Sequence, residues 1–126
     1  YTRSDTLSLH DALPISDVDV DSAIARFCGK EDRYAKYLRL FYADNNYEML
    51  IEALDKGDCE EAFEHCHSLK GVVGNLGFRR MFPNIYDACE KLRAGDMTGV
   101  RQTVEEVGGN YHTIMNIIKN YLCPEE

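Results

Sequence analysis

Residues 58–77 read DCEEAFEHCHSLKGVVGNLG, and this stretch decides the fold. Its apolar side chains recur at helical spacing and, at about 100° per residue, fall within a stripe about 80° wide. The stripe consists of Ala62, Cys66, Leu69, Val73 and Leu76. Asp58 can cap the amino end of such a helix, with Glu61 three residues on, and Gly77 can cap the carboxyl end. The pattern therefore predicts a helix over about residues 58–76 that packs this stripe against a core.

The opposite face of this helix is predicted to be open. His67 lies about 140° from the centre of the stripe, on the side that also carries Glu64, Gly71 and Gly74. Two glycines inside a helix together cost about 2 kcal/mol relative to alanine, so they need a reason. Because they follow His67 by about one and two turns, we expect them to clear space around its imidazole. Lys70, three residues after His67, is its neighbour on the helix and could stabilise phosphate oxygens.

The rest of the chain from residue 17 onward is predicted to be helical as well. We expect a short helix from Asp19 or Asp21 to Gly29, and longer helices over about residues 31–54, 78–93 and 100–121. The polar run at residues 44–46 is a weak point at which the second of these can bend. Short connections favour antiparallel neighbours. The predicted fold is therefore all-α: an up-down antiparallel four-helix bundle with an additional short N-terminal helix.

The last helix has the most regular apolar pattern, alternating steps of four and three residues. Its members are Val100, Val104, Val107, Tyr111, Ile114, Ile118 and Tyr121. This spacing predicts a bundle seam about 30 Å long at 1.5 Å per residue. Gly108 and Gly109 interrupt the seam and indicate a local kink. In the preceding helix, Pro83 fits only in or near the first turn, where the missing amide costs little.

The first sixteen residues look foreign to this pattern. Residues 6–15, TLSLHDALPI, resemble the translation of a common sequencing adapter over ten consecutive positions. We therefore interpret residues 1–16 as a non-native, adapter-like tail, predicted to be disordered, and residues 17–126 as the domain. His10 receives no functional weight on this interpretation.

Composition limits the classes of function. The 126 residues carry a formal net charge of −8, which argues against nucleic acid and anionic membranes as partners. No apolar run approaches the roughly 18 residues that span a bilayer, and no secretory signal is visible. The five cysteines match no zinc or disulfide spacing and are expected to be reduced, mostly as small core residues, in a cytoplasmic protein. They are Cys28, Cys59, Cys66, Cys89 and Cys123.

The helix over residues 58–76 carries a family resemblance. The run His67-Ser68-Leu69-Lys70-Gly71, followed by Asn75-Leu76-Gly77, resembles the phosphoacceptor signature of histidine-containing phosphotransfer (HPt) domains. The helix order is similar too, as are the Gly-Asp pairs at residues 57–58 and 95–96. Together these features extend the resemblance over about residues 18–122.

The resemblance implies a role in a two-component phosphorelay. His67 would accept a phosphoryl group on an imidazole nitrogen, Lys70 would steady it, and Gly71 would provide clearance. The partners implied are a histidine kinase and the receiver domain of a response regulator, whose aspartate exchanges phosphate with His67 and which supplies Mg²⁺. Residues predicted to contact the partner are Glu64, Ser68 and Gly74.

A carrier of this kind needs little machinery of its own. We expect a monomer that binds no cofactor and no metal. The chain has no Walker-type phosphate loop and no room for an ATP-binding kinase domain, so no autonomous turnover is expected.

Two other interpretations remain open at this point. The chain could be a non-catalytic helical adaptor in which His67 only contacts signalling proteins. Alternatively, His65, Cys66 and His67 could bind a metal, although consecutive side chains on a helix point about 100° apart and converge poorly on one ion. His65 lies about 60° from the centre of the apolar stripe and is predicted to be a core-edge residue. His112 follows the seam residue Tyr111 and has no glycine clearing.

Overall fold

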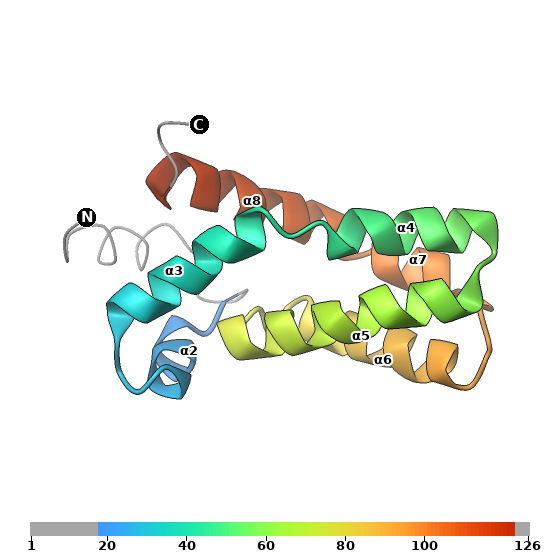
Figure 1. Cartoon of the computed structure of the whole chain (residues 1–126), viewed down its shortest axis with the longest axis horizontal. Helices are drawn as coiled ribbons and strands as arrows, with labels where there is room; N and C mark the ends of the chain where they lie inside the picture. The colour runs from blue at the N-terminus through green and yellow to red at the C-terminus, as the bar shows by residue number, and fades with distance from the viewer. Residues whose placement is uncertain (1–17, 123–126) are drawn as a thin grey trace.

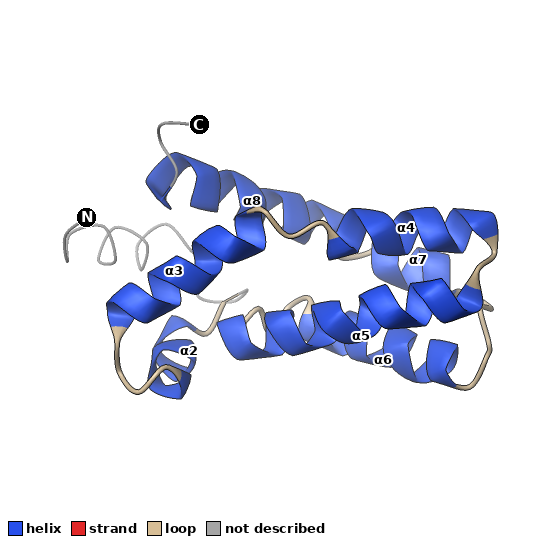
Figure 2. Cartoon of the chain, viewed as in Figure 1, coloured by secondary structure: helices blue, strands red, loops and turns tan. Residues whose placement is uncertain are grey.

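The computed structural model describes residues 18–122, and within them every regular element is a helix (Figures 1 and 2). The elements are α2 (Val20–Arg26), α3 (Glu31–Tyr42), α4 (Asn46–Lys56), α5 (Cys59–Leu76), α6 (Phe82–Arg93), α7 (Val100–Glu105) and α8 (Gly108–Leu122). The all-α prediction is confirmed. The tail proposed for residues 1–16 lies outside the described residues.

The motif helix α5 is one arm of the bundle. It runs antiparallel to α4 before it and to α6 after it, and these are its principal packing partners (Figure 1). α7 lies against α6 and α4, α8 lies along α3, and α2 packs beside α3 and α5. The predicted bundle with a short N-terminal helix is therefore confirmed, with α3 and α4 forming one interrupted arm and α7 and α8 another.

The core is built from the predicted apolar stripes. All five stripe residues of the motif helix are buried. Along the last arm the predicted seam is buried from Val100 to Ile118, but Tyr121 is 47% exposed and Leu122 is buried in its place. The seam prediction was thus wrong at its last position, because the register of α8 carries position 122, rather than 121, into the core.

The long helix predicted over residues 31–54 is in fact two helices. α3 ends at Tyr42, and α4 begins at Asn46 and continues to Lys56. Asp44 Oδ1 accepts a hydrogen bond from the backbone amide of Asn46 at 2.7 Å. A short acidic side chain that binds a nearby free amide offers the backbone an alternative to helical pairing. The polar run therefore stops one helix and starts the next, rather than only bending it.

Two other boundaries also differ from the prediction. The helix expected to start at residue 78 starts at Phe82, which places Pro83 in the first turn, as its chemistry requires. The last arm is interrupted between Glu105 and Gly108. A Cβ at Gly108 would lie 2.8 Å from Tyr47 Oη, so glycine lets α8 begin against α4 at this point.

The carboxyl end of α5 is held by contacts from far along the sequence. Gly77 ends the helix at φ +80°, and its carbonyl accepts a 2.7 Å hydrogen bond from the Asp19 amide. Tyr34 Oη donates to the Leu76 carbonyl at 2.9 Å in a buried position. These bonds satisfy carbonyls that a helix end otherwise leaves free, and they fix the motif helix in the bundle.

None of the helices within residues 18–122 has the length and apolar character to cross a bilayer.

Candidate phosphoacceptor site

The amino end of α5 is capped as predicted. Asp58 Oδ1 accepts a 3.0 Å hydrogen bond from the Glu61 amide, which satisfies one of the first-turn donors. From this start the helix is regular to Leu76, and the buried stripe fixes its rotation. His67 therefore lies in the middle of α5 on the face that points away from the core, and its side chain is exposed.

The imidazole of His67 rests on an aromatic ring from its own helix. Its centroid lies 5.6 Å from that of Phe63, one turn earlier, with 25° between the ring planes. Within residues 18–122, neither ring nitrogen of His67 takes part in a hydrogen bond or ion pair. The nitrogens are therefore not committed to a structural contact in this part of the chain.

The two glycines after His67 have different reasons to be glycine. A Cβ at Gly71 would meet nothing within 4 Å, so the space beside this position is open. A Cβ at Gly74 would lie 3.1 Å from Cε1 of Phe82 on α6. Gly74 therefore makes room for Phe82, and the expectation that it clears space around the imidazole stays a prediction. Its predicted contact with a partner stays a prediction.

Lys70 is directed toward α6. Its Nζ lies 5.4 Å from the centroid of the Tyr86 ring, and Tyr86 is itself 44% exposed. An ammonium over an aromatic face is weakly attracted at an exposed site and is free to leave it. Glu64 and Ser68, the other predicted contact residues on α5, are both exposed.

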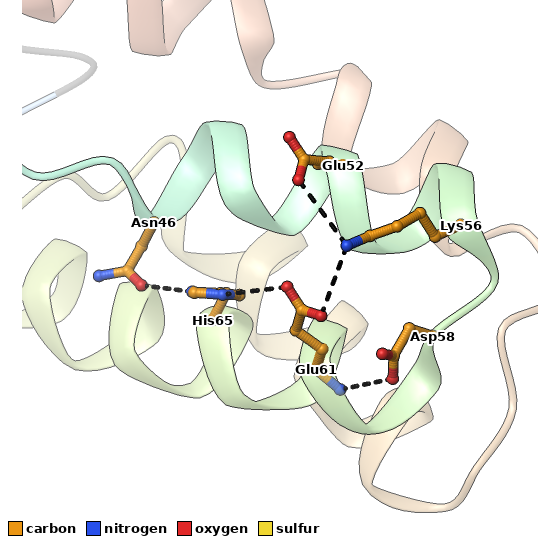
Figure 3. Close-up of polar contacts among 6 residues, drawn as sticks. All are labelled: Asn46, Glu52, Lys56, Asp58, Glu61 and His65. Carbon is orange, nitrogen blue, oxygen red and sulfur yellow. Dashed lines mark hydrogen bonds and ion pairs between the residues drawn. The ribbon is translucent and has the colours of Figure 1, made fainter.

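His65 is engaged in a network between α4 and α5 (Figure 3). Asn46 Nδ2 donates to Asp44 at 3.2 Å, which turns Asn46 Oδ1 toward His65 Nδ1 at 2.9 Å. Because an amide oxygen only accepts, Nδ1 of His65 carries a proton and donates it. The other ring nitrogen, Nε2, faces Glu61 at 3.8 Å. The predicted core-edge position of His65 is confirmed, with its side chain 25% exposed.

The same network continues along the helix ends. Glu61 lies 3.7 Å from Lys56 Nζ, and Lys56 also lies 3.8 Å from Glu52 (Figure 3). These ion pairs are partly exposed, and each contributes little to the stability of the fold. Their effect is to surround the His65 side of α5 with structural contacts.

Cys66 points in a third direction, into the core. Its Sγ lies 3.5 Å from the Ile85 carbonyl, and burial raises the pKa of its thiol to about 12. The side chains of His65, Cys66 and His67 thus diverge, which disfavours a metal site built from them. Elsewhere in residues 18–122, no group of three His, Cys, Asp or Glu side chains is placed to hold a metal ion.

The cysteines are only partly the core residues that we expected. Cys66 and Cys89 are buried, Cys59 is half-buried, and Cys28 is exposed, so the prediction was wrong for Cys28. Cys28 lies in the turn after α2 with φ 59°. Cys123 lies outside the described residues.

The comparison with protein families matches this site and its scaffold. The family model of the Hpt domain matches residues 40–117, more than half of the 126 residues, from the end of α3 into α8. The chain belongs to the Hpt domain family. No curated protein and no solved structure matches the chain. Hpt domains carry phosphoryl groups on histidine in phosphorelays and interact with kinases and receiver domains of two-component systems.

Sequence reasoning missed three side chains around His67 and Lys70 of this Hpt domain. Phe63 stacks on His67, Arg93 lies over Phe63 with its Cζ 5.0 Å from the ring centroid, and the Tyr86 ring lies beneath the Lys70 ammonium. The position of Phe63, four residues before His67, was a usable signal because such residues are neighbours on a helix. Tyr86 and Arg93 lie on α6, and nothing local in the sequence indicates their contacts.

Proposed function

We propose that this Hpt domain accepts a phosphoryl group on His67 and exchanges it with the aspartate of a receiver domain. The observation that carries the proposal is the exposed imidazole of His67, whose nitrogens have no structural partner within residues 18–122, beside the open position at Gly71. A neutral imidazole is a competent nucleophile near neutral pH. Family membership supports the reaction class, and the local geometry supports the choice of histidine.

The transfer is a simple displacement. An unprotonated ring nitrogen of His67 attacks the phosphorus of the receiver's aspartyl phosphate. The N–P bond forms as the bond from phosphorus to the aspartyl oxygen breaks, and the carboxylate leaves with the electron pair. Positioning and charge neutralisation dominate such reactions. Lys70 supplies a cation that can leave the Tyr86 ring for the phosphate oxygens, and Gly71 leaves room for the incoming active site.

The remaining functional assignments belong to the same proposal. The receiver supplies the Mg²⁺, so the chain needs no cofactor of its own, and a histidine kinase is a further phosphate source. We propose that Glu64 and Ser68, which are both exposed on α5, contact either partner. We propose that the domain acts as a monomer in the cytoplasm, without autonomous turnover and without nucleic acid as a partner.

The direct test uses a receiver domain loaded with radiolabelled acetyl phosphate. Mixed with the wild-type chain, it should transfer an acid-labile, alkali-stable label that approaches one phosphate per chain. The chain alone, incubated with ATP, should acquire none. Stable binding to the receiver without any transfer would instead favour the adaptor interpretation and overturn the proposal.

A further inference from the structure

The two sides of His67 along α5 are unequal. One turn before it, the ring of Phe63 lies 5.6 Å away and nearly parallel. One turn after it, the position of Gly71 is open to at least 4 Å. Side chains on a helix lean toward its amino end, so the imidazole leans toward the filled side. The ring is therefore supported from one side and approachable from the other.

Phe63 is itself held in place. It is half-buried against the core and lines a cavity of about 380 Å³ together with Cys59, Leu92 and Arg93. The guanidinium of Arg93, on α6, lies over its ring at 5.0 Å. A cation over an aromatic face and an offset ring stack are both attractive arrangements. Phe63 thus links the acceptor imidazole to a second helix of the bundle.

We propose that Phe63 is a positioning residue for the acceptor, and that it holds the imidazole of His67 in the orientation that receives phosphate. This inference rests on the proposed function of His67. A histidine on a bare helix surface samples several rotamers. A stacked partner restricts them, so a larger fraction of molecules presents the ring toward the open side at Gly71.

The first test is made on the free protein and needs no phosphate donor. In NMR spectra, the ring protons of His67 should show an aromatic ring-current shift that is lost in Phe63→Leu and retained in Phe63→Tyr. Phe82→Leu is the matched control, because Phe82 is also half-buried and aromatic but packs against Gly74 and Tyr86 instead. Unchanged His67 shifts in Phe63→Leu would overturn the proposal.

The second test measures reactivity without a protein partner. Potassium phosphoramidate phosphorylates histidine chemically, so its rate reports on the imidazole alone. We expect Phe63→Leu to label about two- to tenfold more slowly than wild type, the factor that corresponds to one aromatic pair. Phe63→Tyr should restore the rate and Phe82→Leu should not lower it. Equal slowing in both leucine variants would overturn the proposal, because the effect would then be general.

The two tests separate this inference from the proposed function. If the receiver transfers nothing to the wild-type chain but the NMR shift behaves as expected, the function fails and the stack stands. If transfer proceeds on His67 at the same rate in wild type and Phe63→Leu, with unchanged phosphoramidate labelling, the function stands and the positioning role fails.

Discussion

His65 and His67 are two residues apart on one helix, yet they lie in opposite chemical settings. His65 donates from Nδ1 to Asn46, and its Nε2 lies 3.8 Å from the Glu61 carboxylate, so its ring is held between α4 and the first turn of α5 (Figure 3). His67 is exposed, stacks on Phe63 and has no partner for its nitrogens within residues 18–122. Two residues correspond to a rotation of about 200° around the helix axis, so the two side chains point to opposite sides of α5. The comparison teaches that this rotation places one histidine in structural contacts and leaves the ring nitrogens of the other accessible for a reaction.

The largest expected effect tests this contrast head-on. His67→Gln keeps size and polarity but removes the nucleophile, so labelling by a phosphorylated receiver should be abolished while helicity by circular dichroism stays intact. His65→Gln should label at about the wild-type rate. Labelling that survives in His67→Gln and disappears in His65→Gln would reverse the assignment.

A smaller but still large effect is expected at the open position. Gly71→Leu should leave the bundle folded, because nothing occupies the space and leucine is the better helix former by up to about 1 kcal/mol. Transfer from a receiver should nevertheless fall by about 100-fold, because the side chain displaces the approaching active site. Stopped-flow transfer kinetics measure this rate. A normal rate with leucine would show that the open space has no role in transfer.

The next largest effect on the transfer rate is expected at Lys70. Lys70→Ala removes the cation nearest in sequence to His67 and should slow transfer by about tenfold, the value of one charge-assisted contact. The exposed Lys36 on α3 provides the control, because Lys36→Ala makes the same change in net charge away from the site. Equal slowing by both alanine variants would mean that net charge alone accounts for the effect.

The structural side of the comparison predicts an effect on stability instead of transfer. Asn46→Ala removes the acceptor of the His65 Nδ1 proton and should lower the free energy of unfolding by about 1–2 kcal/mol. Urea unfolding measures this change, with the exposed Asn116→Ala as control. Transfer to His67 should be unaffected. A loss of transfer without loss of stability would tie His65 to the reaction.

Cys66 lies between the two histidines in the sequence, and its burial predicts that the stability of the fold depends modestly on pH. Burial raises the pKa of its thiol from 9.0 to about 12. A group whose pKa is raised on folding contributes its full stabilisation below the unfolded value and loses it as the pH rises toward the folded value. The urea midpoint should therefore fall from pH 8 to pH 10.5, and Cys66→Ala should reduce this fall while Cys28→Ala, at an exposed thiol, should not. An equal fall in all three proteins would remove Cys66 from the explanation.

Much of the scaffold could be predicted from the sequence, because it depends on local chemistry. The stripe of α5, the Asp58 cap and the Gly77 terminus are all properties of neighbouring residues, and the structure confirms them. The interruption after Tyr42 was visible only as a polar run, because helical propensity alone does not show whether such a run bends a helix or ends it.

The candidate acceptor site could be predicted in part for the same reason. The open face of α5 follows from helical geometry, which places His67 outward and His65 at the core edge. The packing role of Gly74 could not be predicted, because it depends on the close contact of Phe82, which belongs to another helix. The contacts of Arg93 and Tyr86 were missed for the same reason, because tertiary packing brings distant segments together.

The central claim is that phosphate resides on His67 and on no other histidine, and mapping the modified residue in the wild-type chain tests it most directly. Trypsin should release residues 57–70 as one peptide that contains both His65 and His67. Fragmentation between Cys66 and His67 in a mass spectrometer, at a pH that preserves phosphohistidine, assigns the phosphate. The account predicts the added mass on the fragment that begins at His67; phosphate on His65, or on His112 in another peptide, would contradict it.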